Sequence, residues 1–380
     1  MSNTFIDIHI LQSVPPSNIN RDDTGSPKTA VFGGVRRARV SSQAWKRATR
    51  KRFNETLDKS DIGYRTKRVV ELVADEIRHI DETYQDRVDD TQRLAADVLK
   101  AAGIKLTTPK LPKDAPKGTQ APADQSGYLI FLSAGQIRKL AELAIASDQS
   151  GVKIVVKDAK AAVNQDNSFD VALFGRMVAD DAELNVDAAA QVAHAISVHS
   201  VANEFDYFTA VDDLQERDSE TGAGMIGTVE FNSSTLYRYA TVNVGGLRKN
   251  LGDDAATARA VEAFVDSFTR SMPTGKQNTF ANRTLPDAIV VTIRDDQPIN
   301  LAGAFEDAIT RDDTAGVMAN AASAFAIRHE DVARAYGTGS GHTLVVALGA
   351  AAKPLAGLGE QVSIEDLISQ VGALVAERLS

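Results

Sequence analysis

The chain has no cysteine among its 380 residues. This absence excludes disulfide bonds, thiolate zinc sites and cysteine nucleophiles. No stretch approaches the roughly 20 consecutive apolar residues that a membrane-spanning helix requires. The first residues, MSNTFIDIHI, also lack the basic start of an export signal. These absences predict a protein that has no membrane segment and is located in the cytoplasm.

Aromatic residues are scarce, at 6% of the chain, so the places where they gather are informative. The composition is otherwise ordinary for a globular protein, with 43% hydrophobic and 24% charged residues. At this length the chain is able to bury a large core in one domain or several.

Acidic residues are missing from one long window. Residues 24–54 contain no Asp or Glu but nine Lys or Arg, although the whole chain has a net charge of −9. Positive charge concentrated in one part of an acidic protein is typical of a site for a polyanion, most often a nucleic acid. A solvated basic face would have the same composition.

A helix is predicted within this window, from residue 43 to residue 57, with Ser41-Ser42 supplying its N-cap. Lys46 and Arg47 would lie in its first turn, where the positive end of the helix dipole disfavours basic side chains. Because Lys and Arg beside unpaired backbone N–H groups suit a phosphate, this helix is predicted to bind phosphate. The alternative is a surface helix that pairs with carboxylates from elsewhere in the chain.

Tyr207 and Phe208 are adjacent aromatic residues in the stretch NEFDYFTAV. Neighbouring side chains on an extended segment point to opposite sides, so one could pack while the other is presented to a base. The commoner arrangement places all these aromatic side chains in the core. A polar loop led by glycine, TGKQNTF at residues 274–280, carries Lys276 and would suit contact with a nucleic-acid backbone.

Strand and helix patterns predict an α+β fold. Residues 5–12 alternate in polarity, with Ile6, Ile8 and Ile10 on the one face that we expect to be buried. Further strands are predicted at 190–199, 233–244, 288–293 and 343–347, and further helices at 253–272 and 363–379. Without insertions the order is strand, helix, strand, strand, helix, strand, which is the ferredoxin-like arrangement of RNA-recognition modules. The insertion after the first helix is predicted to be mainly helical, with a flexible Pro- and Lys-rich loop at 103–127.

Signals for catalysis are weak. The six histidines are scattered and lack the paired spacing of a metal motif, and neither a metal ion nor a cofactor is predicted. Asp22 and Asp23 could hold Mg²⁺ for RNA cleavage, but a carboxylate pair beside Arg21 is more typical of a salt-bridged loop. The chain is therefore predicted not to be an enzyme.

Several stretches of the chain closely resemble, in order, the CasC-type backbone subunit of the type I-E CRISPR surveillance complex, Cascade. The longest is NINRDDTGSPKTAVFGGVRRARVSSQAWKRATR at residues 18–50. The others are DVALFGRM, VAHAIS, DYFTAVDDLQ, EFNSSTLYRYATVNV and GKQNTFA. The resemblance extends over most of the chain, with a poor match from about residue 60 to 165.

The resemblance implies a hand-shaped subunit. Residues 1–60, 185–200 and 230–380 would form an RRM-like palm, residues 61–184 a mainly helical fingers insertion, and residues 200–230 a thumb. Copies would assemble head-to-tail as a helical filament along one CRISPR RNA, with each thumb displacing a base at a regular interval. The guide would then pair with target DNA in short segments, so that base pairing reads the sequence. The implied further partners are the large, small, CasD-type and CasE-type Cascade subunits and a helicase-nuclease that the complex recruits.

The resemblance also implies roles for individual residues. Lys46 and Arg50 would grip phosphates, while Met177 and Phe208 would wedge against bases at the kink. Tyr207 stands where we expect Trp and keeps an aromatic face. The full set of residues expected to contact RNA is Arg21, Lys28, Ser42, Gln43, Lys46, Arg50, Met177, Tyr207, Phe208 and Lys276. The acidic residues between 212 and 220 would meet the basic palm of the next copy.

Two alternatives remain at this stage. One is a metal-dependent ribonuclease of the type III backbone class, with Asp22 or Asp23 as the only candidate catalytic residue. The other is a free-standing protein that binds single-stranded RNA and forms no filament.

Overall fold

The structure, a computed structural model, describes residues 3–110, 122–178, 181–210, 225–312, 315–338 and 341–380. The chain divides into two compact units, which we describe separately. Unit 1 comprises Met1–Arg52, Gln191–Asn243 and Val261–Ser380, and unit 2 comprises Phe53–Ala190 and Val244–Ala260.

Unit 1 contains the large sheet and the helices that cover it. Its strands are β1 (Phe5–Ser17), β2 (Thr29–Phe32), β3 (Val35–Val40), β9 (Ala195–Ser197), β10 (Glu204–Ala210), β11 (Met225–Asn243), β12 (Ala288–Arg294), β13 (His342–Ala347) and β14 (Glu360–Gln361), and β8 (Ala190–Val192) joins it at the unit boundary. Its helices are α1 (Ser42–Thr56) and α8 (Asp254–Arg270), which both continue into unit 2, then α9 (Gln277–Phe280), η3 (Ala302–Phe305), α10 (Val317–Tyr336), α11 (Gly349–Leu355) and α12 (Ile364–Leu379).

The sheet places its strands in the order β14-β13-β12-β1-β11-β9-β3-β2, with β8 and β10 also paired to β11. The strand pairs on this path are antiparallel except β13–β14, which is parallel. The fold is therefore mixed α and β with one large mixed sheet, as the sequence predicts at this level. The strand expected at 190–199 is interrupted and forms β8 and β9.

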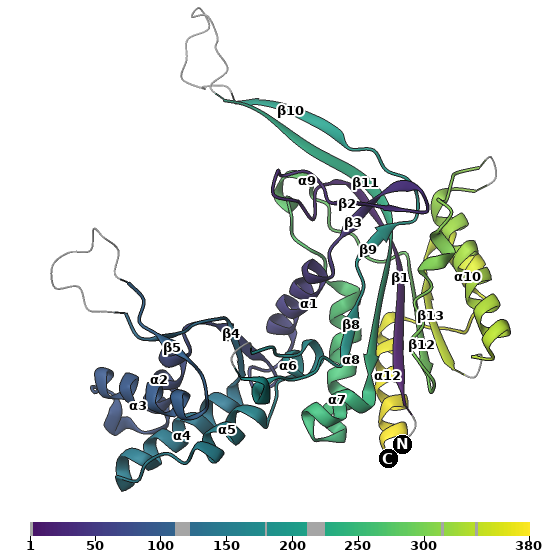
Figure 1. Ribbon diagram of the computed structural model, residues 1–380. Coiled ribbons are helices and arrows are strands. Elements are labelled where there is room, and N and C mark those ends of the chain that lie inside the picture. The colour runs from purple at the N-terminus through teal and green to yellow at the C-terminus, as the bar shows by residue number, and fades with distance from the viewer. Residues whose placement is uncertain (1–2, 111–121, 179–180, 211–224, 313–314, 339–340) are drawn as a thin grey trace, which may run out of the picture. The chain divides into compact units, whose positions relative to one another are not determined.

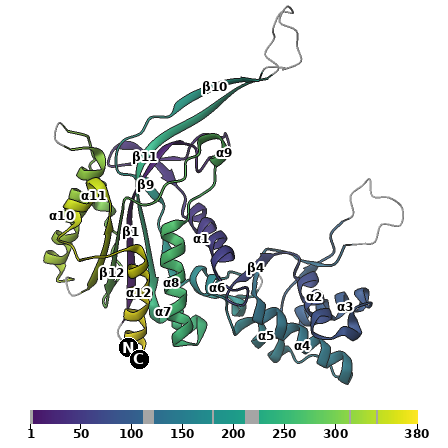
Figure 2. The same cartoon turned by 180° about the vertical axis from the view of Figure 1, so that it is seen from behind.

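Strand β1 lies at the centre of this sheet, and both of its faces are buried. The expectation of a single buried face is therefore wrong, because helices cover both sides of the sheet. Figures 1 and 2 show α10 on one side of these strands and α8 and α12 on the other. On the α10 side, the Asp7 carboxylate accepts from Arg294 Nε at 2.8 Å and from the Tyr239 hydroxyl at 2.8 Å. The Asp7 carboxylate can be buried on this face because it has these partners.

Helix α1 forms where the sequence predicts it. Ser41 caps the helix, since its hydroxyl accepts from the Ala44 amide at 3.2 Å. Trp45, Ala48 and Phe53 lie on its buried side, as their spacing predicts. The N-terminus of the helix is hydrogen-bonded to a loop of unit 1, because the Asn20 side-chain oxygen accepts from the Ser41 amide at 2.8 Å.

A buried arginine attaches α1 to the sheet. Arg238 on β11 places its guanidinium carbon 3.7 Å from the centre of the Trp45 ring and 4.6 Å from that of Phe268 on α8. Its guanidinium donates to Gln12 Oε1 at 2.7 Å and to the Phe268 carbonyl. Burial lowers the pKa of Arg238 to about 9. The cation–π contacts and hydrogen bonds together offset part of the cost of burying this charge.

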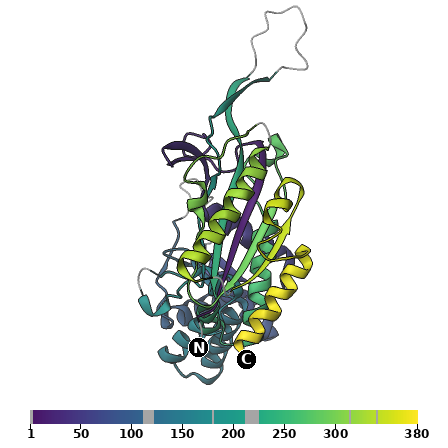
Figure 3. The ribbon, with the colours of Figure 1, turned by 90° about the vertical axis from the view of Figure 1, so that its right-hand side faces the viewer.

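The β10–β11 pair continues beyond the rest of the sheet as a two-stranded ribbon (Figure 3). The paired segment runs from Glu204 opposite Phe231 to Ala210 opposite Met225. The residues between the two strands, 211–224, lie outside the described part of the chain.

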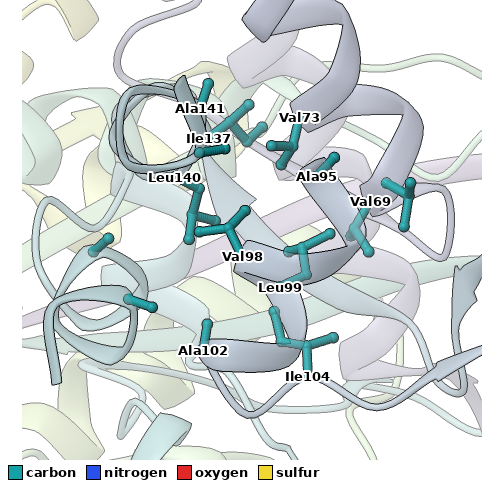
Figure 4. Close-up of a cluster of buried hydrophobic side chains, with 14 of the residues drawn as sticks. Val69, Val73, Ala95, Val98, Leu99, Ala102, Ile104, Ile137, Leu140 and Ala141 are labelled. Carbon is teal, nitrogen blue, oxygen red and sulfur yellow. The ribbon is translucent and has the colours of Figure 1, made fainter. Parts of the chain in front are cut away.

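Unit 2 is built around a helical core. Its elements are β4 (Gly63–Thr66), α2 (Val69–Ile80), η1 (Glu82–Tyr84), α3 (Val88–Ala101), β5 (Leu106–Thr107), β6 (Gln125–Ser126), β7 (Ile130–Ser133), α4 (Ala134–Ser150), α5 (Val156–Asn164), α6 (Phe169–Phe174), η2 (Ala182–Leu184) and α7 (Val244–Leu251). Figure 4 shows how apolar side chains of α2, α3 and α4 meet, including Val73, Leu99 and Leu140, all of them fully buried. Helix α7 and the start of α8 belong to this unit, whereas all of residues 230–380 were expected to lie in the palm.

The segment expected to be a flexible loop, 103–127, is ordered at both ends. Leu106 pairs with Ser126, and Thr107 pairs with Gln125, forming the β5–β6 ladder. Ile104 is buried in the core of unit 2, which fixes the first end of the segment. Residues 111–121 lie outside the described part of the chain. None of the described helices is long and apolar enough to cross a membrane.

Replacing Arg238 with Ala should lower the free energy of unfolding by about 3–5 kcal/mol, because the change leaves a cavity and deprives Gln12 and Trp45 of a buried partner. Urea denaturation followed by Trp fluorescence measures this effect directly, since Trp45 is the only tryptophan in the sequence. Arg334, an exposed arginine on α10, is the matched control, and Arg334→Ala should cost less than about 1 kcal/mol. Equal effects of the two changes would show that the buried guanidinium is not a special attachment point.

Candidate nucleic-acid interface

The loop at residues 18–28 is held in one shape by its own hydrogen bonds. The backbones of Arg21 and Pro27 form an isolated antiparallel β-bridge, and the Lys28 amide donates to the Asn20 carbonyl at 2.9 Å. One carboxylate oxygen of Asp22 accepts from the Thr24 hydroxyl at 2.7 Å and from the Thr24 and Ser26 amides. The Thr24 hydroxyl bond is the main reason that the pKa of Asp22 is lowered. Arg21 is exposed and Lys28 is half-buried on this ordered loop.

Two further segments of unit 1 converge at this loop. The Asn20 side chain accepts from the amide of Ser41, the residue just before α1, which places Ser42 and Gln43 beside the loop. Gly275 packs so closely on the loop that an added Cβ would lie 2.4 Å from the Ile19 carbonyl oxygen. The next residue, Lys276, has a left-handed backbone with φ of 51°. We call the loop 18–28, residues 41–43 and residues 274–276 the basic loop cluster.

Lys46 and Arg50 follow along α1, one and two turns beyond this cluster. At 1.5 Å per residue, Arg50 lies about 10 Å along the helix axis from Gln43. Both side chains are half-buried, and burial lowers the pKa of Lys46. Arg47 and Lys51 are exposed at the intervening positions. The basic residues of α1 therefore extend the cluster along one helix of unit 1.

The arginines just before α1 divide into structural and exposed groups. Arg37 is fully buried and donates to the carbonyls of Phe32, Ser197, Phe305 and Glu306. This arginine holds β3 to the segment around η3, so it is not available to a phosphate. Arg39 donates toward His194 Nδ1 at 3.1 Å, whereas Arg36 is exposed.

Glu230 ties the root of the β10–β11 ribbon to the basic loop cluster. One of its carboxylate oxygens accepts from the Ser26 hydroxyl at 2.8 Å, and the other accepts from the Asn203 side chain at 2.9 Å. The Asn18 side chain also donates to the Glu230 carbonyl at 2.9 Å. These hydrogen bonds therefore connect the start of the ribbon to the loop 18–28.

The ribbon exposes three aromatic side chains. Phe205, Tyr207 and Phe208 retain 67%, 63% and 39% of their accessible surface. The interpretation that these residues belong to the core is therefore wrong, since all three rings are exposed on the ribbon. Phe205 is absent from the set predicted from the sequence. Its spacing of two residues from Tyr207 was the available signal, because alternate residues of a strand share a face.

Phe208 lies on the other face of the ribbon and is held by a glycine. It pairs with Gly227 across the strands, and an added Cβ at position 227 would lie 2.4 Å from Phe208 Cζ. The ring therefore rests directly on the Gly227 backbone. Because Gly227 has no side chain, the Phe208 ring can pack against the backbone of the ribbon.

Met177 belongs to unit 2 and is presented by a tightly held loop. It keeps 82% of its surface, while the neighbouring Arg176 is buried. Arg176 donates to the carbonyls of Leu184, Phe131 and Val163, and burial lowers its pKa to about 10. The Arg176 amide and carbonyl also pair with Val186. Met177 is therefore an exposed apolar side chain on a loop that Arg176 holds in place.

The acidic residues between 212 and 220 that were expected to meet a second copy lie outside the described residues. Asp22 serves its own loop, and no cluster of three metal-binding side chains occurs among the residues that the structure covers.

Nearly the whole chain is similar to chains of two solved CRISPR RNA-guided surveillance complexes. It is similar to a chain of a solved structure described as "CRISPR RNA-guided surveillance complex, pre-nicking", with 33% identity, a TM-score of 0.80, and coverage of 98% of this chain and 100% of that one. A chain of a second structure, described as "CRISPR RNA-guided surveillance complex", has 28% identity and a TM-score of 0.70, with coverage of 96% and 99%. No curated protein matches the chain significantly.

The family is defined by a match over nearly the full length. The model of the CT1975-like proteins, a Cas family, matches residues 6–370. The chain therefore belongs to the CT1975-like family.

Replacing Arg176 with Ala should lower the free energy of unfolding of unit 2 by at least about 2–3 kcal/mol, because several buried carbonyls lose a charged donor. Hydrogen exchange should also speed up at the Val178 and Val186 amides, which belong to the loop that Arg176 holds. Met177→Ala is the matched control, and its stability should stay within about 0.5 kcal/mol of wild type because the side chain is exposed. An unchanged exchange rate at both amides in Arg176→Ala would show that the arginine does not hold the loop.

Proposed function

We propose that this protein is a non-catalytic scaffold subunit that binds CRISPR RNA in a type I-E Cascade complex. The observation that carries the proposal is its similarity, along 98% of its length, to a chain of a CRISPR RNA-guided surveillance complex. The membership of the CT1975-like Cas family agrees with it. The type I-E assignment rests on the close resemblance of residues 18–50 and five shorter stretches to the CasC-type backbone subunit.

The strand order supports an RRM-like palm in unit 1. Strands β12, β1, β11 and β9 are adjacent in that order, and along the chain they are the fourth, first, third and second strands of the strand-helix pattern. Helices α1 and α8 follow the first and third of these strands. This order agrees with the ferredoxin-like topology that we propose for the palm. We assign the helical unit 2 as fingers and the β10–β11 ribbon as the root of the thumb.

The basic loop cluster and α1 are assigned to the RNA backbone. Arg21, Lys28 and Lys276 come from two loops that meet at the N-terminus of α1, where Ser42 and Gln43 lie. Lys46 and Arg50 continue the positive charge along the helix. Cations beside a helix N-terminus suit phosphate oxygens and carry no base preference. This is the chemistry that a scaffold needs if it is to hold any guide sequence.

The exposed apolar side chains are assigned to the bases. Phe208 and Tyr207 on the ribbon, and Met177 on its anchored loop, would contact bases where the RNA is kinked. Copies of the chain would assemble head-to-tail as a filament along the RNA, presenting the guide in segments to target DNA. The large, small, CasD-type and CasE-type subunits and a recruited helicase-nuclease complete the proposed partners, and the cytoplasm is the proposed location.

The double variant Lys46→Ala/Arg50→Ala should bind single-stranded RNA more weakly than wild type. The slope of log K against log[salt] should fall by up to ~0.7 for each phosphate contact that is lost. Fluorescence anisotropy of labelled RNA at several salt concentrations gives both quantities. Arg47→Ala/Lys51→Ala removes the same charge from the same helix and should change the slope less. The RNA should stay intact in these Mg²⁺-containing samples, and cleavage that depends on Asp22 or Asp23 would support the ribonuclease alternative instead.

The mass of the protein–RNA complex should rise with RNA length in steps of one 40.6 kDa chain plus its RNA segment. Analytical ultracentrifugation on RNAs of increasing length measures the steps, because a filament adds one copy for each interval of RNA. A mass that stays constant as the RNA is lengthened would favour the free-standing RNA-binding protein.

A further inference from the structure

The face of the ribbon opposite Phe208 has its own pair of aromatic side chains. Phe205 and Tyr207 are two residues apart on β10, and they pair across the ribbon with Glu230 and Thr228. Residues directly opposite one another in an antiparallel pair share a face. Both rings are more exposed than Phe208, whose ring rests on Gly227. The two faces of the ribbon are therefore chemically different.

Phosphate does not suit this face. Residues 177–216 contain no Lys or Arg, so β10 contributes no cation to this face. The Glu230 carboxylate lies opposite Phe205 and is fixed there by Ser26 and Asn203. The Glu230 carboxylate beside the Phe205 position repels the RNA backbone but leaves the two exposed rings open to an uncharged base. The loop 18–28, which we assign to RNA phosphates, is hydrogen-bonded to the same Glu230.

We propose that Phe205 and Tyr207 form a stacking platform for one unpaired nucleobase of the bound RNA, separate from the contact made by Phe208. This rests on the proposed RNA-binding function and adds a residue and a second base position to it. Residues two apart on a strand are separated by about 6.8 Å, twice the rise of about 3.4 Å between stacked bases, so the interval suits a single base. Stacking on aromatic side chains tolerates every base, as a variable guide requires.

The platform predicts that stacking and electrostatic contributions can be separated. Phe205→Ala should weaken RNA binding by at least about fivefold, the loss expected for one stacked base. The salt slope of binding should not change, because no phosphate contact is lost. With 2-aminopurine placed at successive RNA positions, one position in each binding interval should lose its protein-dependent quenching in this variant. Phe205→Trp should restore both affinity and quenching.

Leu285→Ala is the matched control, because Leu285 is a large apolar side chain of unit 1 with 65% exposure. Wild-type affinity and quenching in Phe205→Ala would overturn the platform while leaving the proposed function intact. If the wild-type protein itself binds no RNA, the proposed function fails first. A change in self-association, measured by sedimentation without RNA, would show that this face contacts a second copy and would also overturn the platform.

Discussion

The arrangement of unit 1 depends on one buried cation, the Arg238 guanidinium. It lies between the Trp45 ring of α1 and the Phe268 ring of α8, and it is hydrogen-bonded to Gln12 of β1. Strand β11, which carries Arg238, also extends into the exposed ribbon. One side chain therefore sets the position of the basic helix relative to the strand that leads to the aromatic residues. A buried charge is expensive without partners, so this geometry is specified more strongly than apolar packing alone would specify it.

The same division between held and presented residues recurs around the candidate interface. The charged side chains of Arg37, Arg176 and Glu230 form hydrogen bonds to carbonyl, hydroxyl and amide groups within the protein. Each of them has an exposed neighbour. Arg36 precedes Arg37, Met177 follows Arg176, and Phe205 lies opposite Glu230. An interface that must hold many RNA sequences gains from this pairing, because preorganised contacts lose less conformational entropy when the ligand binds.

Local features were predictable because short-range physics determines them. The Ser41 cap, the buried side of α1 and the strand at β12 follow from spacing and hydrogen-bonding capacity within a few residues. The central position of β1 did not follow, since alternation indicates one buried face and the second face is covered by α10, more than 300 residues away in the sequence. The ladder at the ends of 103–127 was also missed, because Ile104 is fixed by the core of unit 2 and not by its neighbours.

The sequence by itself determined that positive charge is concentrated in residues 24–54, that cysteine chemistry is excluded, and that aromatic residues gather near 205–208. Only the tertiary structure decided which of those residues are available to a ligand. Arg37 is buried and donates to the carbonyls of Phe305 and Glu306, some 270 positions along the chain, while Arg21 remains exposed on a loop closed by its own hydrogen bonds. The reason is physical: charge is a property of the residue, whereas burial depends on which distant segments the fold brings against it.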